Sequence, residues 1–196
     1  IVAMQSYPIE PGIKYITDPY VDARIASDAI ANHSDKNVYS NLQAFDWSTA
    51  NSQMGSRIPN SKEIRNMAYQ ALLGGSKGII FYTYYHQGWF LPEHPNLWNA
   101  LQVLASELDQ LDAIYLNGTF HMVNTDSDII LAGIWQHQNK GILVILNNSV
   151  YRSENIEINI PRQYPALQEI FEKQPSGLSL QNHTVVGSVQ PLDVHI

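Results

Sequence analysis

The sequence predicts an α/β region followed by an all-β region. Strand-like and helix-like segments alternate three times up to about residue 116. From residue 117 onward, short strand-like segments follow one another with Pro, Gly and Asn between them. Alternating strands and helices favour a parallel sheet with helices outside, whereas successive short strands favour an antiparallel β-sandwich. We therefore expect two domains, residues 1–116 and residues 117–196.

The first strand and helix are expected within residues 1–34. Residues 1–7, IVAMQSY, have the pattern of a short buried strand that ends at Pro8. Asp18 can cap a helix whose first residue is Pro19. One face of this helix is expected to be buried, namely the face of Val21, Ile25 and Ala29.

The second and third units are expected within residues 37–111. Residues 37–45 form the second strand, and Asn60 and Glu63 have the spacing of a capping box at the start of the next helix. Gly74 and Gly75 end that helix, whose buried stripe is Ile64, Met67, Ala68, Ala71 and Leu72. Residues 77–85 form the third strand. Residues 97–111 form the third helix, with its buried face at Leu97, Leu101, Leu104, Leu108 and Leu111.

The remaining residues carry period-two patterns. Residues 121–149 predict two strands joined around Asn139, Lys140 and Gly141. Residues 154–161 alternate Ile with polar groups, and further short strands are expected at residues 167–172, 182–189 and 192–196.

The composition excludes several classes of partner. Eighteen acidic residues against eleven Lys and Arg give a net charge of −7, and nucleic acids require a basic surface, so we expect no nucleic-acid partner. No apolar run approaches the roughly 20 residues of a membrane helix, so we expect no membrane partner. The absence of Cys excludes thiolate zinc sites, and the seven His residues show no metal-ligand spacing. We expect no metal and no cofactor.

A parallel sheet of only three strands cannot shield both of its faces, and purely parallel sheets occur almost only with both faces covered. A complete (β/α)8 barrel takes roughly 250 residues, or about 30 per unit. Residues 1–116 therefore correspond to three of its eight units. We expect the chain to be the C-terminal part of a longer protein, completed by an N-terminal segment of that protein.

The order of segments resembles the C-terminal half of (β/α)8 glycoside hydrolases. The resemblance is carried by SYPI, NLQAFDW, the run EIRNMAYQALLGGSKGIIFY, then LW with an ELDQL helix, and the terminal LDVHI. It covers nearly the whole chain. It implies that the three strands are the sixth, seventh and eighth of the barrel and that residues 117–196 form an accessory β-sandwich. It also implies a carbohydrate substrate and the hydrolysis of glycosidic bonds.

The active site of such a barrel lies at the C-terminal ends of its strands. Sugar sites use aromatic rings for stacking and polar groups for hydrogen bonds to hydroxyls. The strand ends here supply both, and the predicted substrate-binding residues are Tyr7, Gln43, Phe45, Trp47, Tyr82, Tyr84, His86 and Trp89. Alternation puts Gln43, Phe45 and Trp47 on one face unless the strand has already ended. Among the polar residues at the strand ends, Gln43 is the one that we expect to point into the cleft.

Glycosidic cleavage usually needs two carboxyl groups about 5 to 9.5 Å apart. Retaining barrel families that this chain resembles carry them after the fourth and seventh strands, and the fourth strand lies outside this chain. Where the seventh strand of such a family ends in Glu, this sequence has Gln43 and Asp46. Either Asp46 is the catalytic residue, or both carboxylates lie in the missing segment, or the protein no longer cleaves sugars.

Other carboxylates near the strand ends are weaker candidates. Glu10 and Glu93 lie in loops after strands, and Glu63 is explained by its capping box. The prediction is a fragment of a glycoside hydrolase that is inactive alone. The alternatives are a non-catalytic glycan-binding barrel protein and a scaffold or adhesion module whose working part is the β-sandwich.

Overall fold

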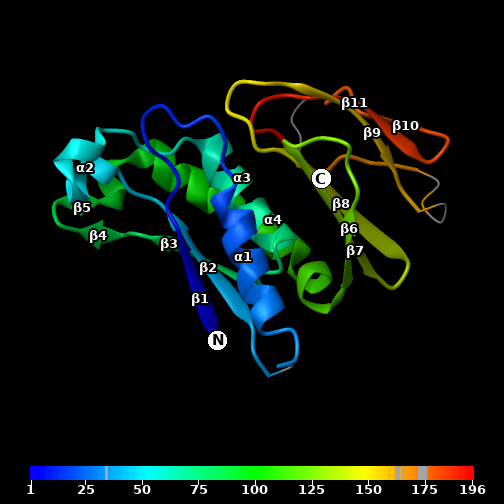
Figure 1. The fold of residues 1–196 in the computed structure, drawn as a ribbon, viewed down its shortest axis with the longest axis horizontal. Helices are drawn as coiled ribbons and strands as arrows, with labels where there is room; N and C mark the ends of the chain where they lie inside the picture. Colours follow the sequence, from blue (N-terminus) through cyan, green and yellow to red (C-terminus); the bar gives the residue numbers. More distant parts are fainter. Residues whose placement is uncertain (34, 162–163, 165, 172–175) are drawn as a thin grey trace.

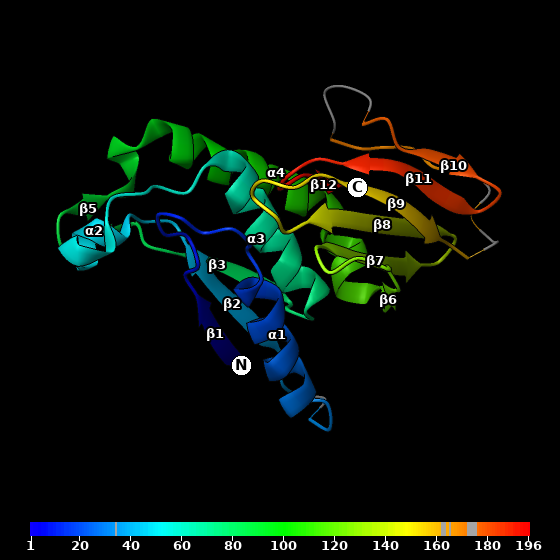
Figure 2. The ribbon, with the colours of Figure 1, turned by 45° about the horizontal axis from the view of Figure 1, so that its top comes forward.

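The computed structural model describes residues 1–33, 35–161, 164, 166–171 and 176–196. Figure 1 shows a mixed structure of helices and sheets. The described residues form a three-stranded parallel sheet, antiparallel sheets of three and four strands, and a small sheet of two short strands. In Figure 2 the helix α3 (Ser61–Leu73) lies between the parallel sheet and the antiparallel sheets, α4 (Pro95–Asn117) passes beside it, and α1 (Asp18–Ala29) packs next to α3 on the same side of the parallel sheet. In the described part of the chain, the helices thus cover one side of the parallel sheet.

The parallel sheet has the strand order β1-β2-β3. Its strands are β1 (Val2–Ser6), β2 (Val38–Gln43) and β3 (Gly78–Tyr82). Helices α1 (Asp18–Ala29) and α3 (Ser61–Leu73) connect them, and α4 (Pro95–Asn117) follows β3. The predicted parallel pairing is present, with Gln5 opposite Asn41 and Asn41 opposite Ile80. The shorter elements are α2 (Trp47–Ala50), η1 (Ser52–Met54), β4 (Tyr85–His86), β5 (Trp89–Phe90) and η2 (Leu91–Glu93).

The two faces of the parallel sheet have different surroundings. On the helix side, Leu42 is fully buried and packs with Ile79 and Phe81 in the main hydrophobic core. On the opposite face, Ala3 and Gln5 are exposed, and the side chain of Ile80 is 49% exposed. We call this second surface, formed by Ala3, Gln5, Tyr39, Asn41 and Ile80, the open face of the sheet.

Helix α3 forms as its sequence predicts. The Asn60 side chain accepts a hydrogen bond from the Glu63 backbone, and the Glu63 carboxylate accepts one from the Asn60 backbone, which is a complete capping box. The predicted stripe is buried throughout, and Gly74 is the C-cap. A Cβ atom at Gly74 would lie 2.7 Å from the Cβ of Ala23, so glycine is what lets α1 approach α3 this closely.

Helix α1 departs from the prediction in two ways. Its N-cap is Thr17, and Asp18 is its first residue. Its buried residues are Pro19, Ala23 and Ala26, whereas Val21 and Ile25 are 44% and 60% exposed and Ala29 is exposed as well. The predicted buried face is therefore wrong, because the close contact with α3 admits only small side chains.

The second half of the chain folds into two antiparallel sheets, with the orders β12-β8-β7-β6 and β10-β11-β9. Isoleucines and valines from both sheets form a shared cluster that includes Ile134, Ile145, Ile158 and Val185. The strands are β6 (Thr119–Val123), β7 (Ile130–His137), β8 (Lys140–Asn147), β9 (Glu154–Asn159), β10 (Ser179–Gln181), β11 (Thr184–Val189) and β12 (Val194–His195).

Three expectations for this region need correction. Residues 121–149 contribute to three strands rather than two, because β6 is separate from β7. The hairpin loop between β7 and β8 is Gln138 and Asn139, one residue earlier than predicted, with Gln138 at a positive φ of 54°. Residues 167–171 form no strand, and Glu172 lies outside the described residues.

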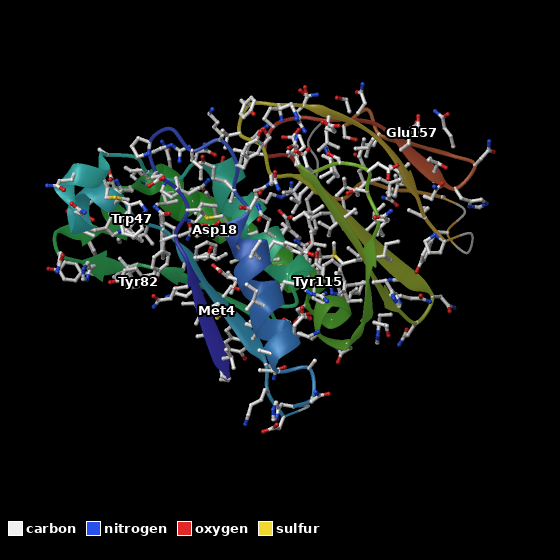
Figure 3. The ribbon with its side chains drawn as sticks, viewed as in Figure 1. Met4, Asp18, Trp47, Tyr82, Tyr115 and Glu157 are labelled. Carbon is white, nitrogen blue, oxygen red and sulfur yellow. The ribbon has the colours of Figure 1, made fainter. Side chains whose placement is uncertain are left out.

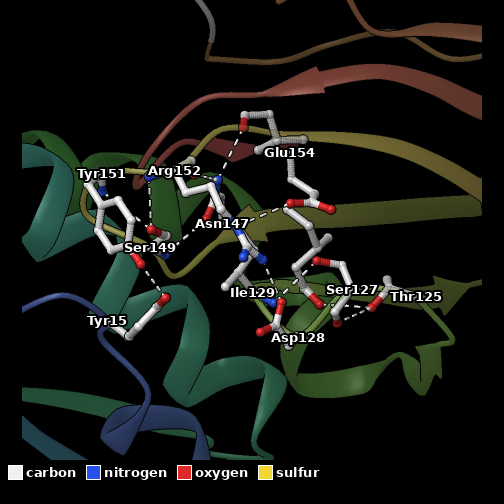
Figure 4. A network of polar contacts seen from close by, with 12 residues as sticks. Tyr15, Thr125, Ser127, Asp128, Ile129, Asn147, Ser149, Tyr151, Arg152 and Glu154 are labelled. Atoms are coloured by element: carbon white, nitrogen blue, oxygen red, sulfur yellow. Dashed lines mark hydrogen bonds and ion pairs between the residues drawn. The ribbon is translucent and has the colours of Figure 1, made fainter.

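Buried polar contacts join the helices to the antiparallel sheets. The Asn66 amide of α3 donates to the carbonyls of Asn147 and Leu192 at 2.9 and 3.2 Å, and its side chain is fully buried. Figure 4 shows the outer part of this junction, where the hydroxyls of Tyr15 and Tyr151 meet. Because unpaired buried amides are costly, these contacts hold the two regions in one arrangement.

Candidate functional site

Five of the predicted site residues gather beyond the C-terminal ends of the parallel strands. The rings of Tyr7 and Tyr82 stack, with centroids 5.8 Å apart, and Phe45 lies edge-on to both at 5.3 and 5.7 Å. Trp47 lies 5.0 Å from Phe45, and His86 lies 5.7 Å from Tyr82. We call these five residues the aromatic cluster. Figure 3 shows Trp47 and Tyr82 at one end of the molecule, with Glu157 at the other.

Tyr7 is the best-anchored member of the cluster. The Trp47 indole donates to the Tyr7 carbonyl at 3.2 Å, and the Asn41 amide donates to the Tyr7 hydroxyl at 2.9 Å. Burial and the neighbouring Tyr82 raise the pKa of Tyr7 above its ordinary value, so its phenol stays protonated at neutral pH. Tyr7 therefore presents a neutral hydroxyl beside partly exposed aromatic rings.

Gln43 was predicted to point into the cleft, but its side chain is buried among backbone groups. Its amide oxygen accepts from the Ile9 backbone N–H at 2.7 Å, and its amide nitrogen donates to the carbonyls of Ile9 and Phe45 at 2.9 and 3.0 Å. The side chain is fully buried. Gln43 therefore ties the loop after β1 to the end of β2, and no part of its amide faces solvent.

Asp46 caps the short helix α2. Its carboxylate accepts from the Ser48 backbone N–H at 2.8 Å and from the Ser56 hydroxyl at 2.5 Å, and the residue is 5% exposed. Burial alone would raise the pKa of Asp46, but hydrogen bonds from Ser56, Ser48 and the Arg57 backbone together hold it below its ordinary value. A general acid needs a raised pKa, and a nucleophile needs access to its substrate, so this geometry favours a structural role.

Strand β2 ends at Gln43, so the alternation expected for Gln43, Phe45 and Trp47 does not continue through them. Phe45 is 4% exposed and forms the inner side of the cluster rather than an open surface. Trp47 begins helix α2 and is partly buried. The rings of Trp47, Tyr7, Tyr82 and His86 are thus more accessible than that of Phe45.

Trp89 and Tyr84 lie apart from the aromatic cluster in their contacts. Trp89 is 2% exposed, stacks on His94 at 3.9 Å and donates its indole N–H to the Thr83 carbonyl. It offers no open ring face, which corrects its placement in the cleft. Tyr84 is 56% exposed and contacts Phe90 of β5 and Trp98 of α4, so it belongs to a second aromatic group.

The remaining carboxylates divide into exposed and structural groups. Glu10 and Glu93 are exposed in their loops. Glu63 is 1% exposed, closes the capping box that its spacing predicts, and also pairs with Arg57.

Among the described residues, no group of three or more His, Asp or Glu side chains is placed to hold a metal ion. None of the described helices is both long enough and apolar enough to cross a membrane.

Sequence reasoning missed Asn41. It lies on the open face, one alternation step before Gln43 in the same strand, and its amide reaches the Tyr7 hydroxyl. The period-two pattern that placed Gln43 also places Asn41 on the same face.

A separate groove of about 890 Å³ lies between the N-terminal halves of α3 and α4, with Lys62, Asn96 and Asn99 along it.

Comparison with known proteins shows likeness in structure. No family model and no curated protein sequence matches this chain. A noncanonic maltogenic alpha-amylase, AmyB from Thermotoga neapolitana, matches with a TM-score of 0.57 and 15% identity over 97% of this chain and 49% of the amylase. A variant of AmyP in complex with maltotriose matches with a TM-score of 0.49 and 10% identity over 88% of this chain and 44% of its own. The chain thus spans about half the length of these structures, and the likeness to AmyB shows a shared fold.

Proposed function

We propose that this chain is the C-terminal part of a (β/α)8-barrel glycoside hydrolase, in which β1, β2 and β3 are the last three barrel strands and residues 117–196 form an accessory β-sandwich. The remaining strands come from a segment outside this chain. The aromatic cluster then lies at the mouth of the barrel and binds carbohydrate. The fold shared with a maltogenic alpha-amylase supports the assignment.

The open face of the parallel sheet carries this proposal. Sequential order with all helices on one side is the arrangement of a barrel wall, whereas a doubly wound sheet has helices on both faces. An open face that exposes 49% of Ile80 is costly in water, because each large apolar side chain left exposed forfeits about 1.5 to 3 kcal/mol. In a closed barrel, Ile80 and its neighbours face the packed interior.

In the proposed enzyme, the residues of this chain bind and orient the sugar. Tyr7, Trp47 and Tyr82 offer ring faces for the C–H faces of a pyranose and a hydroxyl for its polar edge. Because the Asp46 carboxylate is engaged as the cap of α2 and has a lowered pKa, we assign the acid and the nucleophile or base to the segment outside the chain. Hydrolysis then requires both parts of the protein.

The test uses the full-length protein that contains this chain. It is incubated with maltotriose, cellotriose and xylotriose, products are followed by mass spectrometry, and binding is followed by calorimetry. Tyr82→Ala is expected to weaken binding about 2- to 12-fold through lost ring contacts, while Tyr151→Ala, at an exposed site outside the aromatic cluster, leaves it unchanged. Asp46→Asn retains a good helix cap and is expected to retain normal turnover. A loss of about 100-fold or more in turnover would make Asp46 catalytic.

A non-catalytic glycan-binding barrel is the second candidate. It is favoured by the state of Asp46, the carboxylate predicted at the seventh strand, which is 5% exposed and fully engaged as a helix cap. Binding of a trisaccharide without any product from the unaltered full-length protein would support this candidate over the hydrolase.

A further inference from the structure

The Asn41 side chain and the Tyr7 hydroxyl form a hydrogen bond next to the open face. Asn41 lies in the middle strand of the sheet, opposite Gln5 on one side and Ile80 on the other. Its amide nitrogen donates to the Tyr7 hydroxyl oxygen at 2.9 Å. A phenol that accepts a hydrogen bond in this way still has its own O–H to donate, and the direction of that O–H is fixed by the bond it accepts.

The Tyr7 ring cannot easily move away from this position. Tyr82 stacks on it, Phe45 packs against it in a T-shaped contact, and the Trp47 indole donates a hydrogen bond to its backbone carbonyl. Groups held from several sides bind a ligand with a smaller entropic cost than free side chains. The side chain is therefore a preorganised hydrogen-bond donor at the C-terminal end of β1.

We propose that Asn41 is a positioning residue that orients the phenolic O–H of Tyr7 as a donor to a hydroxyl oxygen of a bound saccharide. This inference rests on the proposed carbohydrate-binding function. Sugar hydroxyls both accept and donate hydrogen bonds. A neutral phenol whose O–H points in a fixed direction therefore binds some orientations of the sugar ring better than others. Asn41 itself acts through Tyr7 and does not need to touch the sugar.

The substitution Asn41→Asp reverses the bond with almost no change of shape. A carboxylate only accepts hydrogen bonds, so the phenolic proton of Tyr7 turns toward residue 41 and is no longer available to the sugar. Tyr7→Phe removes the hydroxyl altogether. Each single variant should weaken binding about 2- to 12-fold, and the double variant should bind no more weakly than Tyr7→Phe alone.

The experiment measures binding of maltotriose, cellotriose and xylotriose to the full-length protein by calorimetry, with thermal melting as a check of folding. Gln5→Glu is the matched control, because it adds the same charge to the same face beside Asn41, and it should bind as the unaltered protein does. Unchanged binding by Asn41→Asp, additive losses in the double variant, or an equal loss in Gln5→Glu would overturn the role of Asn41 alone. If the unaltered protein binds none of the three sugars, the proposed function fails and this inference fails with it.

Discussion

Replacing Glu107 by Ala should destabilise the whole chain, because this side chain joins α4 to α3 and, through Arg65, to β12. Its two carboxylate oxygens accept hydrogen bonds from Arg65 Nε at 3.0 and 3.1 Å, and one of them also accepts the hydroxyl proton of Tyr69. Arg65 in turn donates to the carbonyl of Val194 in β12. Glu107 is 5% exposed, so its hydrogen bonds are largely shielded from water.

The expected cost follows from what the substitution leaves behind. Removing one partner of a buried ion pair typically costs about 3 to 5 kcal/mol, because the other charge stays buried and unpaired. The Arg65 side chain is 22% exposed, so water reaches part of it and the lower value of about 3 kcal/mol applies. Burial raises the pKa of Tyr69 and of Tyr115, so neither phenol ionises at neutral pH to replace the lost charge. For a chain of this size, about 3 kcal/mol lowers the melting temperature by about 6 to 12 °C.

Urea denaturation followed by circular dichroism and tryptophan fluorescence measures this effect. Asp28→Ala is the control, because it breaks an ion pair with Arg24 whose two side chains are 61% and 49% exposed, and it should cost less than about 1 kcal/mol. Trp47 and Trp135 lie in the two halves of the chain, so tryptophan fluorescence reports on both halves. A single transition that is the same by fluorescence and by circular dichroism shows that the halves unfold together. The reasoning is wrong if Glu107→Ala costs no more than Asp28→Ala.

Three further substitutions test other parts of the structure. Asp46→Ala should lower the free energy of unfolding by about 1 kcal/mol at pH 7. Since the folded protein lowers the pKa of Asp46, this stabilisation exists above the ordinary aspartate pKa and is lost as pH falls through the lowered value, so the urea curves of Asp46→Ala and the unaltered protein should converge as the pH is taken below that lowered value. Gln43→Leu leaves the buried Ile9 N–H unpaired and should cost about 1 to 3 kcal/mol, measured by the same method. In the full-length protein, Ile80→Lys should lower the melting temperature by several degrees while Tyr85→Lys, at a 68% exposed site, leaves it unchanged, and equal melting temperatures would count against a closed barrel.

The fold was predictable where local signals decide it. The capping box of Asn60 and Glu63 and the glycines after it set both ends of α3, and apolar periodicity set its buried stripe. The prediction failed for α1, where the core contact is made by Ala23 against Gly74. A search for large apolar residues picks the wrong face when two helices pack so closely that only small side chains fit.

The candidate site was predictable in location and less so in detail. Parallel strands bring their C-terminal ends to one edge, so the sequence could place Tyr7, Trp47 and Tyr82 together. It could not show that the Gln43 amide is fully used by Ile9 and Phe45, because those partners come from loop conformations without a periodic signal. Five of the predicted aromatic residues lie together and Trp89 and Tyr84 lie apart, whereas the side chains of Gln43 and Asp46 bind nearby backbone groups.

Two separate surfaces of the α/β region expose apolar side chains that a closed barrel would bury. One is the open face with Ile80, and the other is the outer side of α1 with Val21 and Ile25. The first would face the barrel interior, and the second would contact a helix of a neighbouring unit, since helices of a barrel pack side by side around its wall. If the open face were simply exposed to solvent, the exposed apolar residues on α1 would still need an explanation. If α1 were simply an amphipathic surface helix, the open face would still need one. A missing set of β/α units accounts for both, which is why we propose completion by such a segment.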